Sequence, residues 1–317
     1  MHGVITIFKK ELSDHFSSNR FLILFALIAM LSLITAYMAG LNLAKNLEGI
    51  AKPKFVFLFM FTSSGAQFSL AQFVAFFGPL IGLMLGFDSI NRERNEGTLS
   101  KLLSQPIYRD SVINGKFLAG LTILSLMLVS IVLVVSGLGL TMIGVVPGFE
   151  EIFRIAIYLV ISIFYLAFWL SVGILFSIIF RNVATSALAS LAFWIFFSFF
   201  IYLGANAVAG ALVPDTMDDS NMMLLKSKIE KSIALTSPLQ LYTDATATII
   251  DPMRRTTQAF VQVGMMEQLS MTRFQGPLPL SQSILVVLPY IISLMAIAMV
   301  CFAVSYVVFM KQEIRSL

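Results

Sequence analysis

The stretch FLAGLTILSLMLVSIVLVVSGLGLTMI, Phe117 to Ile143, contains no charged side chain, and it decides the fold of this chain. About 20 apolar residues in a helix span the roughly 30 Å hydrocarbon core of a bilayer, where a helix satisfies its own backbone hydrogen bonds. The rest of the 317-residue chain is similar, since 58% of it is hydrophobic, 12% is charged and the mean hydropathy is +0.90. The sequence therefore predicts an all-α integral membrane protein.

Six apolar segments of this kind predict six transmembrane helices, with both termini on one side of the membrane. The first segment lacks the short apolar core and cleavage site of a signal peptide, so we expect it to stay in the mature protein. The predicted spans are Phe21 to Gly40, Phe68 to Ile90, Phe117 to Ile143, Ile155 to Phe180, Val183 to Leu203 and Ile284 to Met310.

Lysines and arginines in the short flanks predict the orientation, because they tend to stay in the cytoplasm. Eleven lie on the side of the termini and four on the other side, with the long fifth loop excluded. The eleven are Lys9, Lys10, Arg20, Arg92, Arg94, Lys101, Arg109, Lys116, Arg181, Lys311 and Arg315, and the four are Lys45, Lys52, Lys54 and Arg154. Both termini and the loop 91–116 are therefore expected on the cytoplasmic side of the plasma membrane.

The net charge of +4 and the pI near 9.2 predict lipid rather than nucleic acid as a partner. The positive charge lies at the membrane edges, where anionic headgroups attract it. The single cysteine, Cys301, falls within the last span and has no partner for an internal disulfide.

Residues 1–20 predict a helix that lies in the headgroup plane. Ile5, Phe8, Leu12 and Phe16 recur at helical spacing, with charged residues elsewhere on the helix. The alternative is an ordinary helical lead-in to the first span. Domain boundaries then follow as 1–20, 21–203 with the loop 91–116, 204–283, and 284–317 for the last span and the tail.

Residues 204–283 form the largest insertion and predict a small helical subdomain on the external side, because a loop of about 80 residues is too long to be unstructured. One amphipathic helix is expected around its apolar stripe, and a second between Pro238 and Pro252. The stripe consists of Leu224, Leu225, Ile229, Ile233 and Leu235.

Methionines gather in this insertion. Thioethers are ligands for Cu(I), but they also fill apolar surfaces and adapt to partners, and no His or Cys lies nearby. Both readings stay open, and an external partner protein is compatible with the second. The methionines are Met217, Met222, Met223, Met253, Met265, Met266 and Met271.

The charged stretch Asp88 to Lys116, DSINRERNEGTLSKLLSQPIYRDSVINGK, separates two predicted spans. Thr98 can cap a short helix that Pro106 ends. Leu99, Leu102 and Leu103 share one face of it. On a cytoplasmic loop such a face either docks on a soluble subunit or rests on the headgroups.

Glycines recur every fourth residue on the second span, at Gly78, Gly82 and Gly86, and allow another helix to approach closely. This seam is either static packing or a surface that moves during transport. Asp88 ends the same span, as a carboxylate for proton coupling or as a solvated helix end. Few other charges lie deep in the spans, which favours an apolar or amphipathic cargo.

Several segments resemble type-2 ABC transporter permeases, in the branch that includes the nitrous-oxide-reductase maturation permease. The order of residues Arg92 to Leu99, Leu102 to Ser104, Pro106, Ile107, Arg109 and Gly115-Lys116 is similar to the loop after that family's second span. FKKEL at Phe8 to Leu12 is similar to its N-terminal elbow helix. SPLQLYTDATATIIDP and FMKQEIR, Phe309 to Arg315, complete the resemblance.

The resemblance implies a permease subunit of an exporter that works as a homodimer or heterodimer with two cytoplasmic ABC ATPase subunits. The loop would then be the coupling helix. Glu93, Arg94 and Glu96 would make polar contacts with the partner, Gly97, Thr98 and Pro106 would shape the helix, and Leu99, Leu102 and Leu103 would seat in a groove.

The chain itself carries no phosphate-binding loop of the G-x-x-x-x-G-K-[ST] type, so ATP and Mg²⁺ are expected in the partner and no cofactor in this chain. Its two histidines, His2 and His15, form no catalytic set or metal motif with other residues. Six spans are also compatible with a secondary carrier or channel, or with a membrane anchor or assembly factor that recruits a partner through the external subdomain. The sequence does not name the cargo.

Overall fold

The computed structural model describes residues 2–46, 55–62, 69–105, 107–213, 220–252 and 277–312. In these ranges every regular element is a helix, and six helical segments are long and apolar enough to cross a membrane. The all-α membrane class and the six candidate spans are thereby confirmed.

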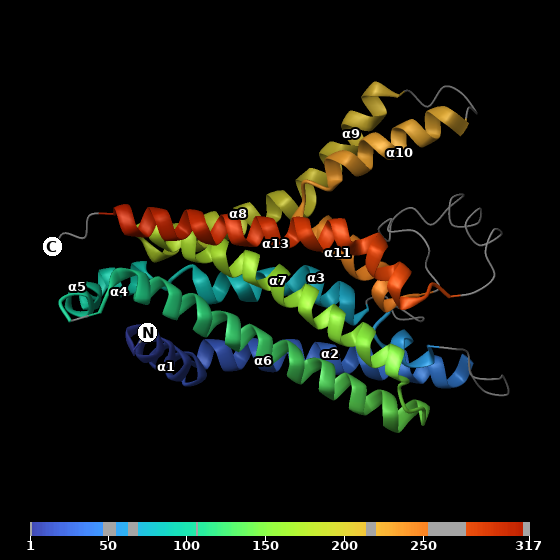
Figure 1. Cartoon of the computed structure of the whole chain (residues 1–317), viewed down its shortest axis with the longest axis horizontal. Coiled ribbons are helices and arrows are strands. Elements are labelled where there is room, and N and C mark those ends of the chain that lie inside the picture. Colours follow the sequence, from blue (N-terminus) through green and yellow to red (C-terminus); the bar gives the residue numbers. More distant parts are fainter. Residues whose placement is uncertain are drawn as a thin grey trace.

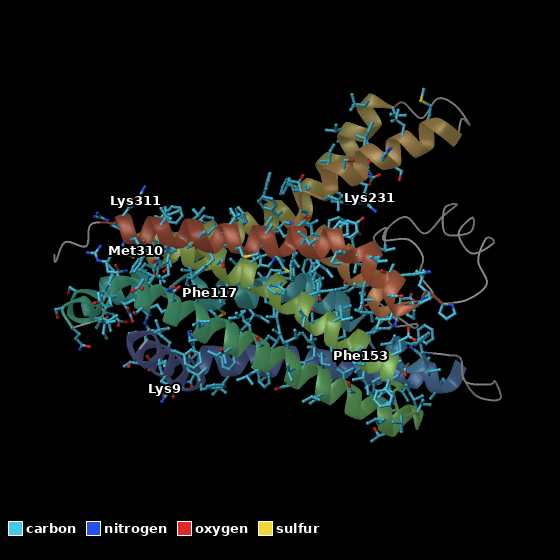
Figure 2. All side chains as sticks on the ribbon, in the orientation of Figure 1. Lys9, Phe117, Phe153, Lys231, Met310 and Lys311 are labelled. Atoms are coloured by element: carbon cyan, nitrogen blue, oxygen red, sulfur yellow. The ribbon has the colours of Figure 1, made fainter. Side chains whose placement is uncertain are left out.

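Apart from α9 (Ile201–Leu212), the spanning helices lie side by side in Figure 1, with α1 (His2–Phe16), α4 (Asn91–Asn95), α5 (Thr98–Leu103) and the end of α13 (Leu280–Lys311) at one end, which we call the basal end. The other end, called distal, carries η1 (Val56–Met60) and α11 (Pro238–Ile250). The spanning helices are α2 (Asn19–Asn46), α3 (Leu70–Gly86), α6 (Arg109–Ile143), α7 (Phe149–Ile179), α8 (Val183–Ile195) with its continuation α9 (Ile201–Leu212), and α13 (Leu280–Lys311). Figure 2 places Lys9 and Lys311 at the basal end and Phe153 at the distal end.

The central helix of the bundle is α7, which packs against α3, α6, α11 and α13. Its Tyr165 and Ser162 are fully buried and contact neighbouring helices. Tyr165 donates to the carbonyl of Ala75 at 2.7 Å and stacks on Tyr242 of α11, with ring centroids 4.3 Å apart. The hydroxyl groups of Tyr242 and Ser162 are 2.8 Å apart. These contacts bring α3 and α11 onto the same side of α7.

The glycine seam of α3 packs directly on α7, as the spacing predicts. A Cβ added at Gly78 would lie 2.8 Å from Leu166 Cδ2, and one at Gly82 would lie 3.1 Å from the Cβ of Trp169. At Gly86 the neighbours are backbone atoms, with Ile174 N at 2.8 Å. The seam is therefore a close helix contact, while its movement stays a prediction.

The arrangement of the insertion 204–283 differs from the single external subdomain that the sequence predicts. The fifth span runs on to Leu212, past the predicted end at Leu203, through a π-helical turn η2 (Phe196–Phe200). The following helix α10 (Ser220–Ala234) packs on α9, and the pair projects from the bundle in Figure 1. By contrast, α11 packs against α7, α13 and α3, and Leu241, Ala245 and Ile249 are among its buried residues.

A buried arginine fixes the distal end. The guanidinium of Arg154 on α7 is fully buried and donates to the carbonyls of Thr248 and Ile249, both at 3.2 Å, in the last turn of α11. It also donates to Leu278 O at 2.7 Å and pairs with Glu150 at 2.9 Å. A cation is favourable at a helix C-terminus, where the last carbonyls lack intrahelical donors. Arg154 thus ties α11 and the start of α13 to α7.

Substitution of Gly86 by Ala tests the glycine seam. Because the added methyl would meet backbone atoms of α7, we expect Gly86→Ala to destabilise the chain by about 1–3 kcal/mol, as overpacking does. The measurement is the thermal unfolding midpoint of the purified protein in detergent.

Gly137→Ala is the matched control, since a Cβ there has no atom within 4 Å. Alanine favours a helix over glycine by about 1 kcal/mol, so this variant should be neutral or slightly stabilised. Equal midpoints for the two variants would refute the close packing of α3 on α7.

Candidate functional site at the basal end

The basal loop between α3 and α6 is anchored to α7 at its start. The hydroxyl oxygen of Ser177 accepts hydrogen bonds from Ile90 N at 2.8 Å and Asn91 N at 3.0 Å. These two amides precede or begin α4, where backbone N–H groups have no partner within the helix. Asn91 is fully buried and donates through its side-chain amide to Phe87 O. The loop therefore leaves the bundle in a fixed direction.

A four-member charge network joins this loop to α1 and α6. The ammonium of Lys116 on α6 lies 2.8 Å from Glu11 Oε1 on α1 and 3.0 Å from Glu93 Oε1 on α4. Lys10 bridges the same two carboxylates at 3.1 and 3.0 Å. The side chain of Lys116 is only 4% exposed, so its charge depends on these partners. We call Lys10, Glu11, Glu93 and Lys116 the basal charge network.

The network sets the protonation of its members. Burial would raise the pKa of Glu11, but the ammonium groups of Lys116 and Lys10 outweigh burial, and the pKa lies below its ordinary value. For Lys10, burial would lower the pKa, and the carboxylates of Glu11 and Glu93 raise it above its ordinary value. The members described by these shifts are charged at neutral pH.

A second set of hydrogen bonds joins the loop to Gln312, directly after α13. Arg94 donates to Gln312 Oε1 at 2.6 Å, and Arg109 donates to the carbonyl of Gln312 at 3.1 Å. The side chain of Gln312 donates in turn to Ile178 O near the end of α7. The loop thus contacts α1, α6, α7 and the end of α13 through polar side chains.

Several predicted coupling residues point into the chain rather than outward. Glu93 belongs to the basal charge network, and Arg94 is bound to Gln312. Leu99 is 1% exposed, and Leu102 packs against the core, because the bundle offers the apolar surface that this helix face needs. The side chain of Leu103 and the whole of Pro106 lie outside the described residues.

Thr98 is the first residue of α5 and not its cap. Gly97 precedes the helix in the left-handed region, with φ of 68°, and no side chain caps it. The hydroxyl group of Thr98 donates instead to Glu93 O at 3.1 Å. The exposed residues from α4 to the start of α5 are called the basal corner. They are Arg92, Asn95, Glu96, Gly97 and Thr98.

The helix α1 packs along the start of α6 and is separate from α2. It ends at Phe16, before α2 begins at Asn19, whereas a helical lead-in would continue without a break. Ile7 is 2% exposed against Gly115 of α6, and Ile5 and Phe16 are about half exposed. Phe8 and Leu12 are partly buried. An exposed apolar face suits a helix at the headgroup level, and its place in the membrane stays a prediction.

A cavity of about 720 Å³ lies among α1, α2, α3, the basal loop and α6. The basal charge network and Asp88 line part of it, and apolar side chains of the spans line the rest. Asp88 has an interaction partner within the chain, at the end of α3 where the sequence predicts a solvated helix end. A cavity of this size falls in the range of small-molecule sites.

No group of three or more His, Cys, Asp or Glu side chains is placed to hold a metal within the ranges that the structure describes. Of the methionines in the insertion, Met222 is exposed on α10. The side chain of Met223 is not described, and Met217, Met253, Met265, Met266 and Met271 lie outside the described residues. The copper hypothesis therefore stays untested.

These features define a multi-pass helical membrane protein with a rigid, charged loop between its second and third spans. Residues 5–314 match the family described as ABC-2 family transporter protein, and the chain belongs to that family. This confirms the resemblance to ABC transporter permeases.

The relatives are similar over part of their length. The chain is 35% identical over 127 residues to the probable ABC transporter permease protein NosY of Stutzerimonas stutzeri, which covers 40% of this chain and 41% of that protein. It is also 35% identical over 127 residues to the protein of the same name in Pseudomonas aeruginosa, covering 40% and 42%. The similarity thus spans about two fifths of these relatives.

Replacement of Lys116 by Met tests the basal charge network. The variant leaves Glu11 and Glu93 close together without their most buried cation, so we expect it to lose about 3–5 kcal/mol of stability, as when one partner of a buried pair is removed. The thermal unfolding midpoint in detergent measures this loss. Lys9→Met, on the exposed side of α1, is the control and should change the midpoint little. A wild-type midpoint for Lys116→Met would contradict the network.

Glu11 also predicts a pH dependence. Its pKa is lower in the folded chain than the ordinary value of 4.5, so its contribution is fully present above about 4.5 and is lost as pH falls through the folded pKa. We therefore expect wild type to lose stability below about pH 4.5 more steeply than Glu11→Gln, which starts lower at neutral pH. Unfolding midpoints from about pH 7 to 3.5 measure both slopes. Parallel slopes for wild type and Glu11→Gln would refute the assignment.

Proposed function

We propose that this chain is the permease subunit of an ATP-driven ABC transporter and that cytoplasmic ATPase subunits bind its basal corner. The observation that carries the proposal is the attachment of the basal loop to four other parts of the bundle. The loop is bound to α6 and α1 through Lys116 and Lys10, to α7 through Ser177, and to the end of α13 through Gln312. Family membership supports it.

In this proposal the loop transmits force as a rigid body. A partner that pushes on the exposed residues Glu96 to Thr98 also displaces Glu93, because Thr98 is hydrogen-bonded to the Glu93 carbonyl. Glu93 then moves Lys116 and, with it, the basal ends of α6 and α1. Arg94 transmits the same displacement through Gln312 to the bases of α13 and α7. The basal ends therefore tilt together rather than singly.

Transport requires a route that one bundle does not supply. We propose that two permease copies pair with two ATPase subunits, and that tilting of the spans opens a route between the copies for export of an apolar or amphipathic cargo. The fifth span, Val183–Leu212, supports pairing. Only 11% of its apolar segment is buried within the chain, so most of it is available to a second copy. ATP and Mg²⁺ bind to the partner in this scheme. Both termini and the basal corner face the cytoplasm of the cell.

A pull-down from mild detergent separates this function from the alternatives. The tagged chain should retain an ATPase in roughly equal amount, with ATP hydrolysis that responds to the permease. A secondary carrier or channel would move cargo with no ATPase bound, and a membrane anchor would retain a non-ATPase partner through its distal side. Either result would overturn the proposed function.

Replacement of Gly97 by Val tests the basal corner. Gly97 has φ of 68°, where a residue with a Cβ is strained by about 1–2 kcal/mol, so the corner should rearrange. We expect permease-stimulated ATP hydrolysis to fall about tenfold, the factor that corresponds to 1.4 kcal/mol. The assay uses the permease–ATPase complex in nanodiscs.

Gly144→Val is the matched control, because Gly144 has φ of 64° and equally open surroundings, but follows α6 at the distal end. The same strain there should leave ATP hydrolysis unchanged. If both variants lose activity equally, or neither loses any, the basal corner is not the contact that transmits the force.

A further inference from the structure

The fifth span consists of two parts that pack on different neighbours. Its first part, α8, packs on α3 and α7, whereas α9 packs on α10, and the α9–α10 pair projects from the bundle (Figure 1). We call α9 and α10 the distal arm. The π-helical turn η2 lies between the two parts, and a single π-turn is one of the features at which helices kink. The arm therefore joins the bundle where the span is locally irregular.

The turn η2 is held from the side by α11. The hydroxyl group of Ser237 is buried and donates to Phe197 O at 2.6 Å. Ser237 occupies the N-cap position of α11, where a serine ordinarily accepts a hydrogen bond from an amide of the first turn, but its side chain makes no such bond. The hydroxyl group thus serves the π-turn instead of its own helix. Because Arg154 fixes the other end of α11, Ser237 ties η2 to an immobile part of the bundle.

The base of the arm makes one ion pair with the interior. The ammonium group of Lys231, near the end of α10, lies 3.7 Å from Asp244 Oδ2 on α11 and 5.6 Å from the centre of the Tyr290 ring on α13. Asp244 is fully buried, whereas the side chain of Lys231 is 29% exposed. A buried carboxylate is costly without its cation, but an ammonium group that already contacts water is easily rehydrated. The pair therefore favours the observed position of the arm and breaks through movement of Lys231.

The helix on which Lys231 rests is also interrupted at this point. Pro289, directly before Tyr290, lies inside α13 and has no backbone N–H to donate to the preceding turn. The hydroxyl group of Ser293 donates to Pro289 O at 2.8 Å, in the same turn of the helix. Irregular backbone thus lies beside the arm in both the fifth and the sixth spans.

We propose that the distal arm is a movable element that turns at η2, with Ser237 as its fixed point, and that Lys231 latches it in the observed orientation by pairing with Asp244. The device is contained within this chain and needs no ATPase. The inference therefore goes beyond the proposed function, and its test is independent of whether an ATPase binds.

The experiment measures distances between spin labels in the full-length chain in nanodiscs, with Cys301→Ala to remove the native thiol. One label pair, at Leu212 and Leu285, joins the tip of α9 to α13, and both positions are well exposed, at 64% and 68%. The second pair, at Leu212 and the exposed Ser232, lies within the arm. Double electron–electron resonance gives the distance distribution of each pair.

Lys231→Met should release the arm. We expect the distribution between arm and bundle to broaden or to gain a second maximum, while the distribution within the arm stays unchanged. Lys228→Met is the matched control, since Lys228 is exposed on the same helix, and it should change neither pair. A wild-type distribution in folded Lys231→Met overturns the latch, and equal broadening of both pairs overturns the movement of the arm as a unit.

Asp244→Asn removes the other charge with little change of shape and should reproduce the effect of Lys231→Met. This variant also keeps the test decisive if Lys231→Met fails to fold. Residues that act only through each other are not additive, so the double variant should be no broader than either single variant. Additive broadening overturns the pairing of Lys231 with Asp244.

Ser237→Ala tests the fixed point by hydrogen exchange of the same full-length chain. Loss of the bond to Phe197 O should accelerate exchange of the amides in η2, while the first turn of α11 keeps its wild-type rate because Ser237 does not cap it. Acceleration confined to α11, or no acceleration, overturns the assignment of Ser237.

Discussion

The structure of the basal end depends on one constraint: the buried charge of Lys116 must be paired. Lys116 begins a span, is almost fully enclosed and has apolar residues after it in sequence, so its ammonium group requires carboxylates from other elements. Glu11 and Glu93 supply them from α1 and α4. The requirement is reciprocal, because the two carboxylates repel each other without the lysines. Removal of any member takes away two of the four ion pairs, and so α1, the loop and α6 hold one arrangement.

The distal end follows the same logic with a different donor. Arg154 satisfies carbonyl groups rather than carboxylates, and its planar fork reaches α11 and the segment before α13 at once. Glu151 complements it, since its carboxylate accepts from Phe57 N and Gly148 N and holds η1 at the start of α7. Between these two polar ends the spans pack through apolar side chains, the glycine seam and buried hydroxyl groups such as those of Tyr165 and Ser162.

The sequence was sufficient for the class and much of the fold, because membrane spans are a local property of composition. Gly78, Gly82 and Gly86 were also readable, since their spacing alone puts them on one helix face. Long-range partners were not readable. Periodicity marks a face as apolar but does not say what covers it, so Leu99 was predicted to face a partner and instead packs inside the chain. Lys116 was counted as a flanking charge. Its apolar neighbours in the sequence were nevertheless a signal that its ammonium group needed a partner.

The inward position of Leu99 changes the kind of contact that the basal corner offers. An apolar helix face would bind a partner through burial of apolar surface. Because the hydrophobic effect is non-directional, that contact would hold the partner in both the pushed and the released position of the loop. The corner instead presents Arg92, Glu96 and the hydroxyl group of Thr98, with Arg92 and Glu96 paired to each other at 3.0 Å. Exposed polar groups contribute little to affinity but fix register and orientation. Under the proposed function, this loop transmits compression through its attachments to the bundle, and the specificity of docking comes from charge.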